Sequence, residues 1–258
     1  MDTQKTVLIL IDGMRSDAIA QCGEPWAQKL IADSASCLEA RTVMPSVTLP
    51  CHMSLFYSVD VERHGVTTNF FSPMVRPLDG LIECLSKEGK KSALFYTWEH
   101  LRDLTRPGGL AYSLLINMFE NPDPDDQVTD AAIAYIQKIR PDFVFLYLGD
   151  TDEAGHDFGW MGEKYLDTVA NAWRCVRRVR ETIPEEYNII VTADHGGHDR
   201  THGTDLPEDM TIPVICNGPA FPVGTVLKQA SIKDIAPTIA RLAGVAAPKT
   251  WEGHPLLE

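Results

Sequence analysis

The sequence lacks the features that would place it in a membrane or in a fold held by disulfides. No apolar run approaches the roughly 20 residues that a transmembrane helix needs. The first such run, residues 7–11, is too short for the core of a secretion signal and ends at Asp12. No Cys-x-x-Cys pair occurs among the six cysteines, which are Cys22, Cys37, Cys51, Cys84, Cys175 and Cys216. We therefore expect a cytoplasmic protein with reduced thiols and no membrane partner.

Basic residues are few relative to acidic ones. The chain has 23 Lys and Arg against 36 Asp and Glu, which gives a net charge of −13. Because nucleic-acid-binding surfaces are usually basic, this balance argues against a nucleic-acid polymer as the partner. It does not argue against phosphate chemistry, since bound metal ions can reverse the local field.

Low-complexity tracts and internal repeats are absent too, and the composition is that of a globular protein. Of the 258 residues, 44% are hydrophobic and 23% are charged. A chain of this length can bury a large core as one domain. We therefore expect a single domain over residues 1–258.

Buried strands alternate with amphipathic helices along the chain. The run at residues 6–11 is continuously apolar, as in a strand that is covered on both faces. The pattern predicts strands over residues 6–11, 92–96, 143–148, 187–192 and 212–216, and helices over residues 26–34, 49–59, 78–87, 125–139, 163–182 and 231–242. This order indicates an α/β fold with a mostly parallel central sheet sandwiched between helices.

The segment 98–126 interrupts this alternation. It is rich in residues that break helices and strands, namely Pro107, Gly108, Gly109, Pro122 and Pro124. We expect a loop-rich excursion that forms a small cap or insertion within the domain.

Polar residues follow the three most apolar strands at their carboxyl ends. Asp12 follows the first strand, Asp150 and Asp152 follow the strand at 143–148, and Asp194 and His195 follow the strand at 187–192. In open α/β sheets, ligands gather at this edge. Each acid alone could be an ordinary helix cap, but three strand ends with the same chemistry favour one shared site.

Histidines add nitrogen ligands to these acids. Asp152 stands four residues before His156, and His195 is followed by His198 and His202. Carboxylate oxygen and imidazole nitrogen together suit zinc or a similar divalent ion. The remaining histidines are interpreted as packed or surface residues: His52, His64, His100 and His254.

Thr48 is the candidate nucleophile. It lies where a loop enters the helix predicted over residues 49–59, and free N–H groups at such a position favour a nearby anion. A threonine there is most often only a helix cap, and it becomes a nucleophile only if a metal lowers its pKa. Ser46 and Thr42 are competing hydroxyls.

Taken in order, these motifs resemble the alkaline phosphatase superfamily, and within it the type I phosphodiesterase and nucleotide pyrophosphatase branch. The resemblance extends from Val7 to Gly244. It rests on Asp12-Gly, Thr48-Leu-Pro-Cys-His52, Asp152-Glu-Ala-Gly-His156, Asp194-His195-Gly, His202-Gly203 and the tail that begins Asp234-Ile-Ala-Pro-Thr. Each motif is weak alone, but together in this order they are specific.

The resemblance implies two divalent metal ions, with zinc favoured and manganese as the alternative. One site would use Asp12, Thr48, Asp194 and His195, and the other Asp152, His156 and His202. Asp152 is preferred to Asp150, and His202 to His198, because of the family's motif spacing. Asn69 matches the asparagine that, with the nucleophile's N–H, holds a phosphoryl oxygen; otherwise it is a turn residue.

The implied activity is hydrolysis of a small phosphate ester by a phosphodiesterase or nucleotide pyrophosphatase. Cys51 stands where the pyrophosphatases usually have asparagine, and the chain is short beside the secreted enzymes, so the substrate stays open. A phosphomonoesterase or a hydrolase of a carbon–phosphorus bond remains an alternative. So does a catalytically inactive binding protein stabilised by metal. A sulfatase is disfavoured, because its Cys/Ser-x-Pro-x-Arg signature is absent around Thr48. The sequence carries no signal for an oligomeric state.

Overall fold

The computed structural model describes residues 3–106 and 108–257 of the chain. Within them the strands form a single sheet in the order β2-β7-β6-β1-β5-β3-β4. Only β7 runs against its neighbours, β2 and β6; the other neighbouring pairs are parallel. The strands are β1 (Lys5–Ile11), β2 (Ala35–Arg41), β3 (Ser92–Tyr96), β4 (Tyr112–Leu115), β5 (Phe143–Leu148), β6 (Tyr187–Thr192) and β7 (Thr211–Asn217).

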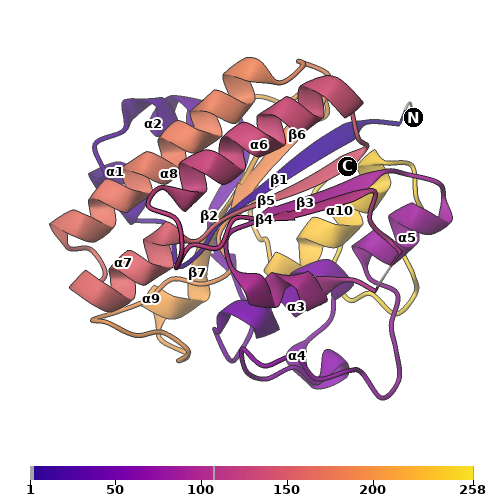
Figure 1. Cartoon of the computed structure of the whole chain (residues 1–258), viewed down its shortest axis with the longest axis horizontal. Coiled ribbons are helices and arrows are strands. Elements are labelled where there is room, and N and C mark those ends of the chain that lie inside the picture. Colours follow the sequence, from indigo (N-terminus) through magenta and orange to yellow (C-terminus); the bar gives the residue numbers. More distant parts are fainter. Residues whose placement is uncertain (1–2, 107, 258) are drawn as a thin grey trace.

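Helices cover the sheet on both faces. Figure 1 shows α2, α6 and α8 over one face and α3, α5 and α10 over the other. The helices are α1 (Ala18–Gln21), α2 (Pro25–Ala32), α3 (Thr48–Tyr57), α4 (Val61–His64), α5 (Leu81–Lys87), α6 (Pro124–Ile139), α7 (Asp150–Phe158), α8 (Glu163–Thr182), α9 (Pro207–Met210) and α10 (Ile235–Leu242), with short 3-10 turns at η1 (Glu99–Leu104) and η2 (Ile232–Asp234). The predicted α/β fold with a mostly parallel, helix-covered sheet is confirmed.

The two strands at the edges of the sheet were missing from the prediction. β2 alternates irregularly between buried and exposed residues, and β4 is exposed or half-buried throughout. An edge strand buries too little to leave a clear apolar pattern. β4 lies inside the segment 98–126 and pairs with β3, so this segment contributes η1 and an edge strand as well as loops.

Two further expectations can be compared with the described residues. All six cysteines are free thiols. Among the described residues, no helix combines the length and the apolar composition that a membrane crossing requires.

The strand order brings the three polar strand ends together. β1 lies between β6 and β5, and residues 7–11 of β1 have no exposed surface. Ile11 pairs with Leu148 of β5, and Leu10 pairs with Thr192 of β6. The residues that follow these strands therefore leave the sheet side by side, at the carboxyl ends of its central strands.

A buried carboxylate fixes the start of α7 at this edge. Asp125 belongs to α6 and is 1% exposed. Its side chain accepts hydrogen bonds from the backbone N–H groups of Gly149 (2.9 Å) and Asp150 (3.4 Å). Because the first N–H groups of a helix have no partner within the helix, this contact from a neighbouring helix takes the place of a local cap.

We predict that Asp125→Ala lowers the free energy of unfolding by about 1–3 kcal/mol, because it leaves one buried and one half-buried N–H group without an acceptor. Asp125→Asn should cost less, since its amide oxygen can still accept one of the two bonds. Urea unfolding of the metal-free variants measures the difference. Wild-type stability in Asp125→Ala would show that water replaces the carboxylate.

Candidate metal centre and nucleophile

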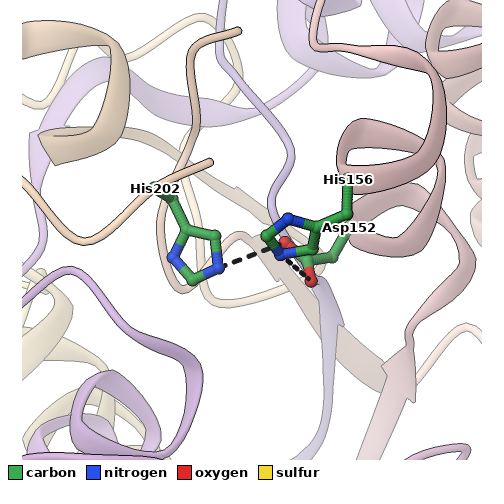
Figure 2. A group of neighbouring side chains, drawn as sticks. All are labelled: Asp152, His156 and His202. Atoms are coloured by element: carbon green, nitrogen blue, oxygen red, sulfur yellow. Dashed lines mark ion pairs between the residues drawn. The ribbon is translucent and has the colours of Figure 1, made fainter. Parts of the chain in front are cut away.

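The residues proposed as metal ligands converge at the carboxyl edge of the sheet. Two groups have ligand atoms that all lie within 4.8 Å of one another: Asp152, His156 and His202, and Asp12, Asp152 and His195. Figure 2 shows the first group, in which Asp152 and His156 project from α7 toward His202 on a loop. His156 Nε2 lies 3.4 Å from Asp152 Oδ2, and His202 Nε2 lies 3.8 Å from Asp152 Oδ1.

His195 is the centre of the second half of the site. Its Nε2 atom lies 3.2 Å from Thr48 Oγ1, 3.3 Å from Asp12 Oδ1 and 3.3 Å from Asp194 Oδ2. The hydroxyl of Thr48, the first residue of α3, therefore reaches the same cluster as the acids that follow β1 and β6. Asp152, which belongs to both groups, lies between the two halves.

Backbone carbonyls hold all three histidines by the same ring nitrogen. The Nδ1 atoms of His156, His195 and His202 lie 3.0, 2.8 and 2.8 Å from the carbonyl oxygens of Arg200, Gly196 and Ser46, respectively. An Nδ1–H that donates to a carbonyl fixes the tautomer and leaves the Nε2 lone pair free as a metal ligand.

The protonation of these histidines bears on metal binding. Burial, followed by the neighbouring His202, lowers the pKa of His195 to about 3, so this ring is neutral at pH 7. The hydrogen bond with Asp152 raises the pKa of His156 to about 9. A cation that binds Asp152 and His156 must therefore displace a proton at neutral pH.

The carboxylates of the site are buried without sufficient compensation from protein groups. Asp12 Oδ1, Asp152 Oδ1 and Asp194 Oδ2 are buried and have no hydrogen-bond partner among the described residues. Burial, together with Asp194 and Asp152, raises the pKa of Asp12 well above its ordinary value. Burial and the charge of Asp152 raise the pKa of Asp194 to about 8. Buried carboxylates of this kind are stable when they coordinate cations, and the oxygen and nitrogen donors suit zinc.

The competing hydroxyls are engaged elsewhere. Ser46 Oγ donates to the carbonyl of Thr204 at 2.8 Å, and Thr42 Oγ1 donates to Cys51 Sγ at 3.2 Å. Of these three hydroxyls, the structure places only Thr48 Oγ1 against the acids and His195. Cys51 is fully buried, and burial raises the pKa of its thiol, so it is a packing residue.

Asn69 lies beside the start of α3. Its Oδ1 atom accepts a hydrogen bond from the backbone N–H of Leu49 at 3.0 Å. This bond assigns the amide orientation, with the oxygen of Asn69 toward the first turn of α3, which begins at Thr48.

His198 and Asp150, which were disfavoured as metal ligands relative to His202 and Asp152, make other contacts. His198 Nδ1 lies 2.7 Å from Asp209 Oδ1, and buried Asp209 also accepts from the N–H of Thr204. Asp150 begins α7, where its N–H donates to Asp125. Neither His198 nor Asp150 belongs to a group of described residues that could hold a metal ion. Asp194 is outside these groups as well, but its Oδ2 atom lies 3.3 Å from His195 Nε2.

Two residues that support the site were not recognised from the sequence. The hydroxyl of Tyr147 donates to Asp12 Oδ2 from within β5. His52, expected to be a packed residue, is fully buried, and its Nδ1 lies 2.7 Å from the carbonyl oxygen of Thr48 and 3.6 Å from Asp194 Oδ2. His52, itself part of α3, thus contacts both the first turn of that helix and Asp194. Tyr147 lies within an otherwise apolar strand, and in the sequence only its hydroxyl indicates a polar partner.

The sequence of the chain is similar to those of known proteins. The model of the type I phosphodiesterase / nucleotide pyrophosphatase family matches residues 6–78 and 81–207. A 2,3-bisphosphoglycerate-independent phosphoglycerate mutase from Francisella tularensis is 27% identical over 133 residues, which is 49% of this chain and 26% of the mutase. Human ectonucleotide pyrophosphatase/phosphodiesterase family member 7 is 22% identical over 222 residues, 74% of this chain and 47% of that protein. The chain thus spans between about a quarter and about half of the length of these curated relatives.

Among solved structures, murine ectonucleotide pyrophosphatase/phosphodiesterase 5, an inactive threonine-to-alanine variant in complex with AMP, superposes with a TM-score of 0.81 at 15% identity, over 96% of this chain and 97% of that one. At this identity the likeness establishes the fold, which is alkaline phosphatase-like. Since the family model covers most of the chain, including the strands and loops that carry the candidate metal ligands and Thr48, the protein belongs to the type I phosphodiesterase / nucleotide pyrophosphatase family.

Proposed function

We propose that this protein is a metal-dependent hydrolase of small phosphate esters, a phosphodiesterase or nucleotide pyrophosphatase with Thr48 as its nucleophile. One observation carries the proposal: Thr48 Oγ1, at the start of α3, lies 3.2 Å from His195 Nε2, within a cluster of buried carboxylates. A hydroxyl with only a capping role would not need this cluster around it.

The chain offers ligands for two divalent ions, with zinc favoured and manganese as the alternative. Asp12, Asp194, His195 and Thr48 would hold one ion, and Asp152, His156 and His202 the other. Bound there, the ions would supply the positive charge that lowers the pKa of the Thr48 hydroxyl and neutralises the phosphate oxygens.

The residues of the chain supply the remaining steps. Thr48 Oγ1 gives its proton to solvent and attacks phosphorus, the bond to the leaving oxygen breaks, and that oxygen takes up a proton from water. The phosphoryl group, with its second ester group if the substrate is a diester, is then bound to Thr48. Water attacks this intermediate, and the Thr48 oxygen departs and recovers a proton. The N–H of Thr48 and the NH₂ of Asn69 donate to a phosphoryl oxygen, and the hydrogen bond to Leu49 keeps Asn69 oriented for this task.

The structural neighbour supports a nucleotide-like substrate. It is inactive with a threonine replaced by alanine and binds AMP, which agrees with a threonine nucleophile and a nucleoside monophosphate product here. Similarity to a phosphoglycerate mutase favours a second candidate on the same site, a phosphomonoesterase. The remaining alternative on the same site is hydrolysis of a carbon–phosphorus bond. A panel of aryl phosphodiesters, monoesters, dinucleotides and phosphonates, tested with the zinc-reconstituted protein, separates these activities.

Metal removal is the first test. We expect about two zinc ions per chain by elemental analysis after reconstitution. Chelation should lower the thermal unfolding midpoint by several degrees, because buried carboxylates then face one another without a cation, and added zinc should restore it. A reconstituted protein without metal, and with an unchanged midpoint, would contradict the proposed mechanism.

The choice between two histidines is the second test. His202→Ala should lower both the zinc content and the activity, because it removes a proposed ligand from the group with Asp152 and His156. His198→Ala is the matched control and should keep its zinc, since His198 is paired with Asp209. If His198→Ala loses metal and His202→Ala does not, the assignment of this ligand is wrong.

The nucleophile is the third test. Thr48→Ala should reduce turnover by roughly 10³-fold or more while costing only about 1 kcal/mol of stability. Thr48→Ser should keep part of the activity, because the hydroxyl remains. Ser46→Ala, which removes a neighbouring hydroxyl bonded to Thr204, serves as the control and should stay active. Near wild-type turnover in Thr48→Ala would mean that water attacks the ester directly.

A further inference from the structure

One tryptophan contacts all three segments that carry the proposed ligands. Trp160 lies between α7 and α8 and is 7% exposed. Its Nε1–H donates to the carbonyl oxygen of Gly13 at 2.9 Å, and Gly13 directly follows Asp12. The indole is thereby bonded to the chain at the end of β1.

Two glycines make room for the same indole in the other ligand segments. A Cβ atom at Gly155 would lie 2.6 Å from the Trp160 ring, and one at Gly197 would lie 2.2 Å from it. Such distances are too short for any side chain. Gly155 stands directly before His156, and Gly197 follows His195 by two residues and precedes His202 by five. The backbones of α7 and of the loop after β6 are therefore packed directly on the indole.

The indole also packs against two of the ligand side chains. Its ring centroid lies 5.1 Å from that of His156 in an edge-to-face arrangement and 6.0 Å from that of His202. These are the two imidazoles that Figure 2 shows together with Asp152. Trp160 thus packs against two of the three proposed ligands in this half of the site.

We propose that Trp160 is a positioning residue that sets the spacing of the three ligand segments, and with it the affinity of Asp152, His156 and His202 for a metal ion. The inference rests on the proposed metal centre. Ligands on a helix and on separate loops bind a cation tightly only when their support is rigid, and residues outside the ligand set typically change metal affinity by about 10–100-fold.

Trp251 provides a matched control. It is 9% exposed, and its Nε1–H donates to the carbonyl of Asp79 at 2.9 Å; Asp79 lies just before α5, outside the three ligand segments. Trp160→Phe and Trp251→Phe each remove one buried indole N–H bond to a backbone carbonyl, so the two variants should lose similar stability without metal. Only Trp160→Phe should weaken zinc binding, by about 10–100-fold in competition with a chromophoric chelator.

The visible absorption of the cobalt(II)-substituted protein gives a second readout, because it reports ligand geometry. It should change in Trp160→Phe and stay as in wild type in Trp251→Phe. A wild-type protein that binds no zinc would defeat the proposed function itself. If the wild type binds zinc and Trp160→Phe binds it equally well, with an unchanged cobalt spectrum, the proposed function stands and the role of Trp160 falls.

A measurement on the wild type covers the case in which Trp160→Phe does not fold. If Trp160 joins the ligand segments, zinc must rigidify it in return, so hydrogen exchange of its indole N–H should slow on zinc binding. Exchange at Trp251 should be unaffected. Equal exchange at Trp160 with and without bound zinc would overturn the inference.

Discussion

Three carboxylates, those of Asp12, Asp152 and Asp194, are buried together at one edge of the sheet, and the rest of the site is arranged around their charge. The strand order β6-β1-β5 brings them close together, because each follows one of three adjacent strands or lies in the first turn of the helix after it. Protein groups neutralise only part of this charge. Tyr147 donates to Asp12, but each of the three acids keeps a buried oxygen without a partner among the described residues. A cation bound among these carboxylates would therefore stabilise the fold, and metal binding and folding would be energetically linked.

Residues and backbone groups outside the proposed ligand set orient the candidate ligands. Carbonyl oxygens select the imidazole tautomers, Asp125 fixes the first turn of α7 from a neighbouring helix, and His52 holds the carbonyl of Thr48. The same holds beside Thr48, the proposed nucleophile, where Asn69 is itself oriented by an N–H of α3. Precision at the cluster therefore comes from backbone contacts that are distributed over most of the domain.

Sequence reasoning located the central strands and the candidate ligands because both leave strong local signals. Residues 6–11 and 143–148 are continuously apolar, and a polar residue after such a run marks the edge of a parallel sheet. Edge strands β2 and β4 gave no such pattern, since half of their surface stays exposed. Asp125, Tyr147 and Trp160 could not be found for a different reason. Their roles depend on contacts with residues far away in the chain, and nothing in their immediate neighbourhood signals those contacts.

The antiparallel direction of β7 allows a short connection to carry three of the candidate ligands. Because β7 is antiparallel to β6, the connection between them leaves and re-enters the sheet at the same edge, as in a wide hairpin. A parallel successor would have required a crossover to the opposite edge. The connection is thus free to remain beside the carboxylates for its whole length, and it brings Asp194, His195 and His202 to the cluster within nine residues. The pairing of β6 with β7 therefore fixes the position of this loop, and a shift in the register of that pair would displace three of the candidate ligands at once.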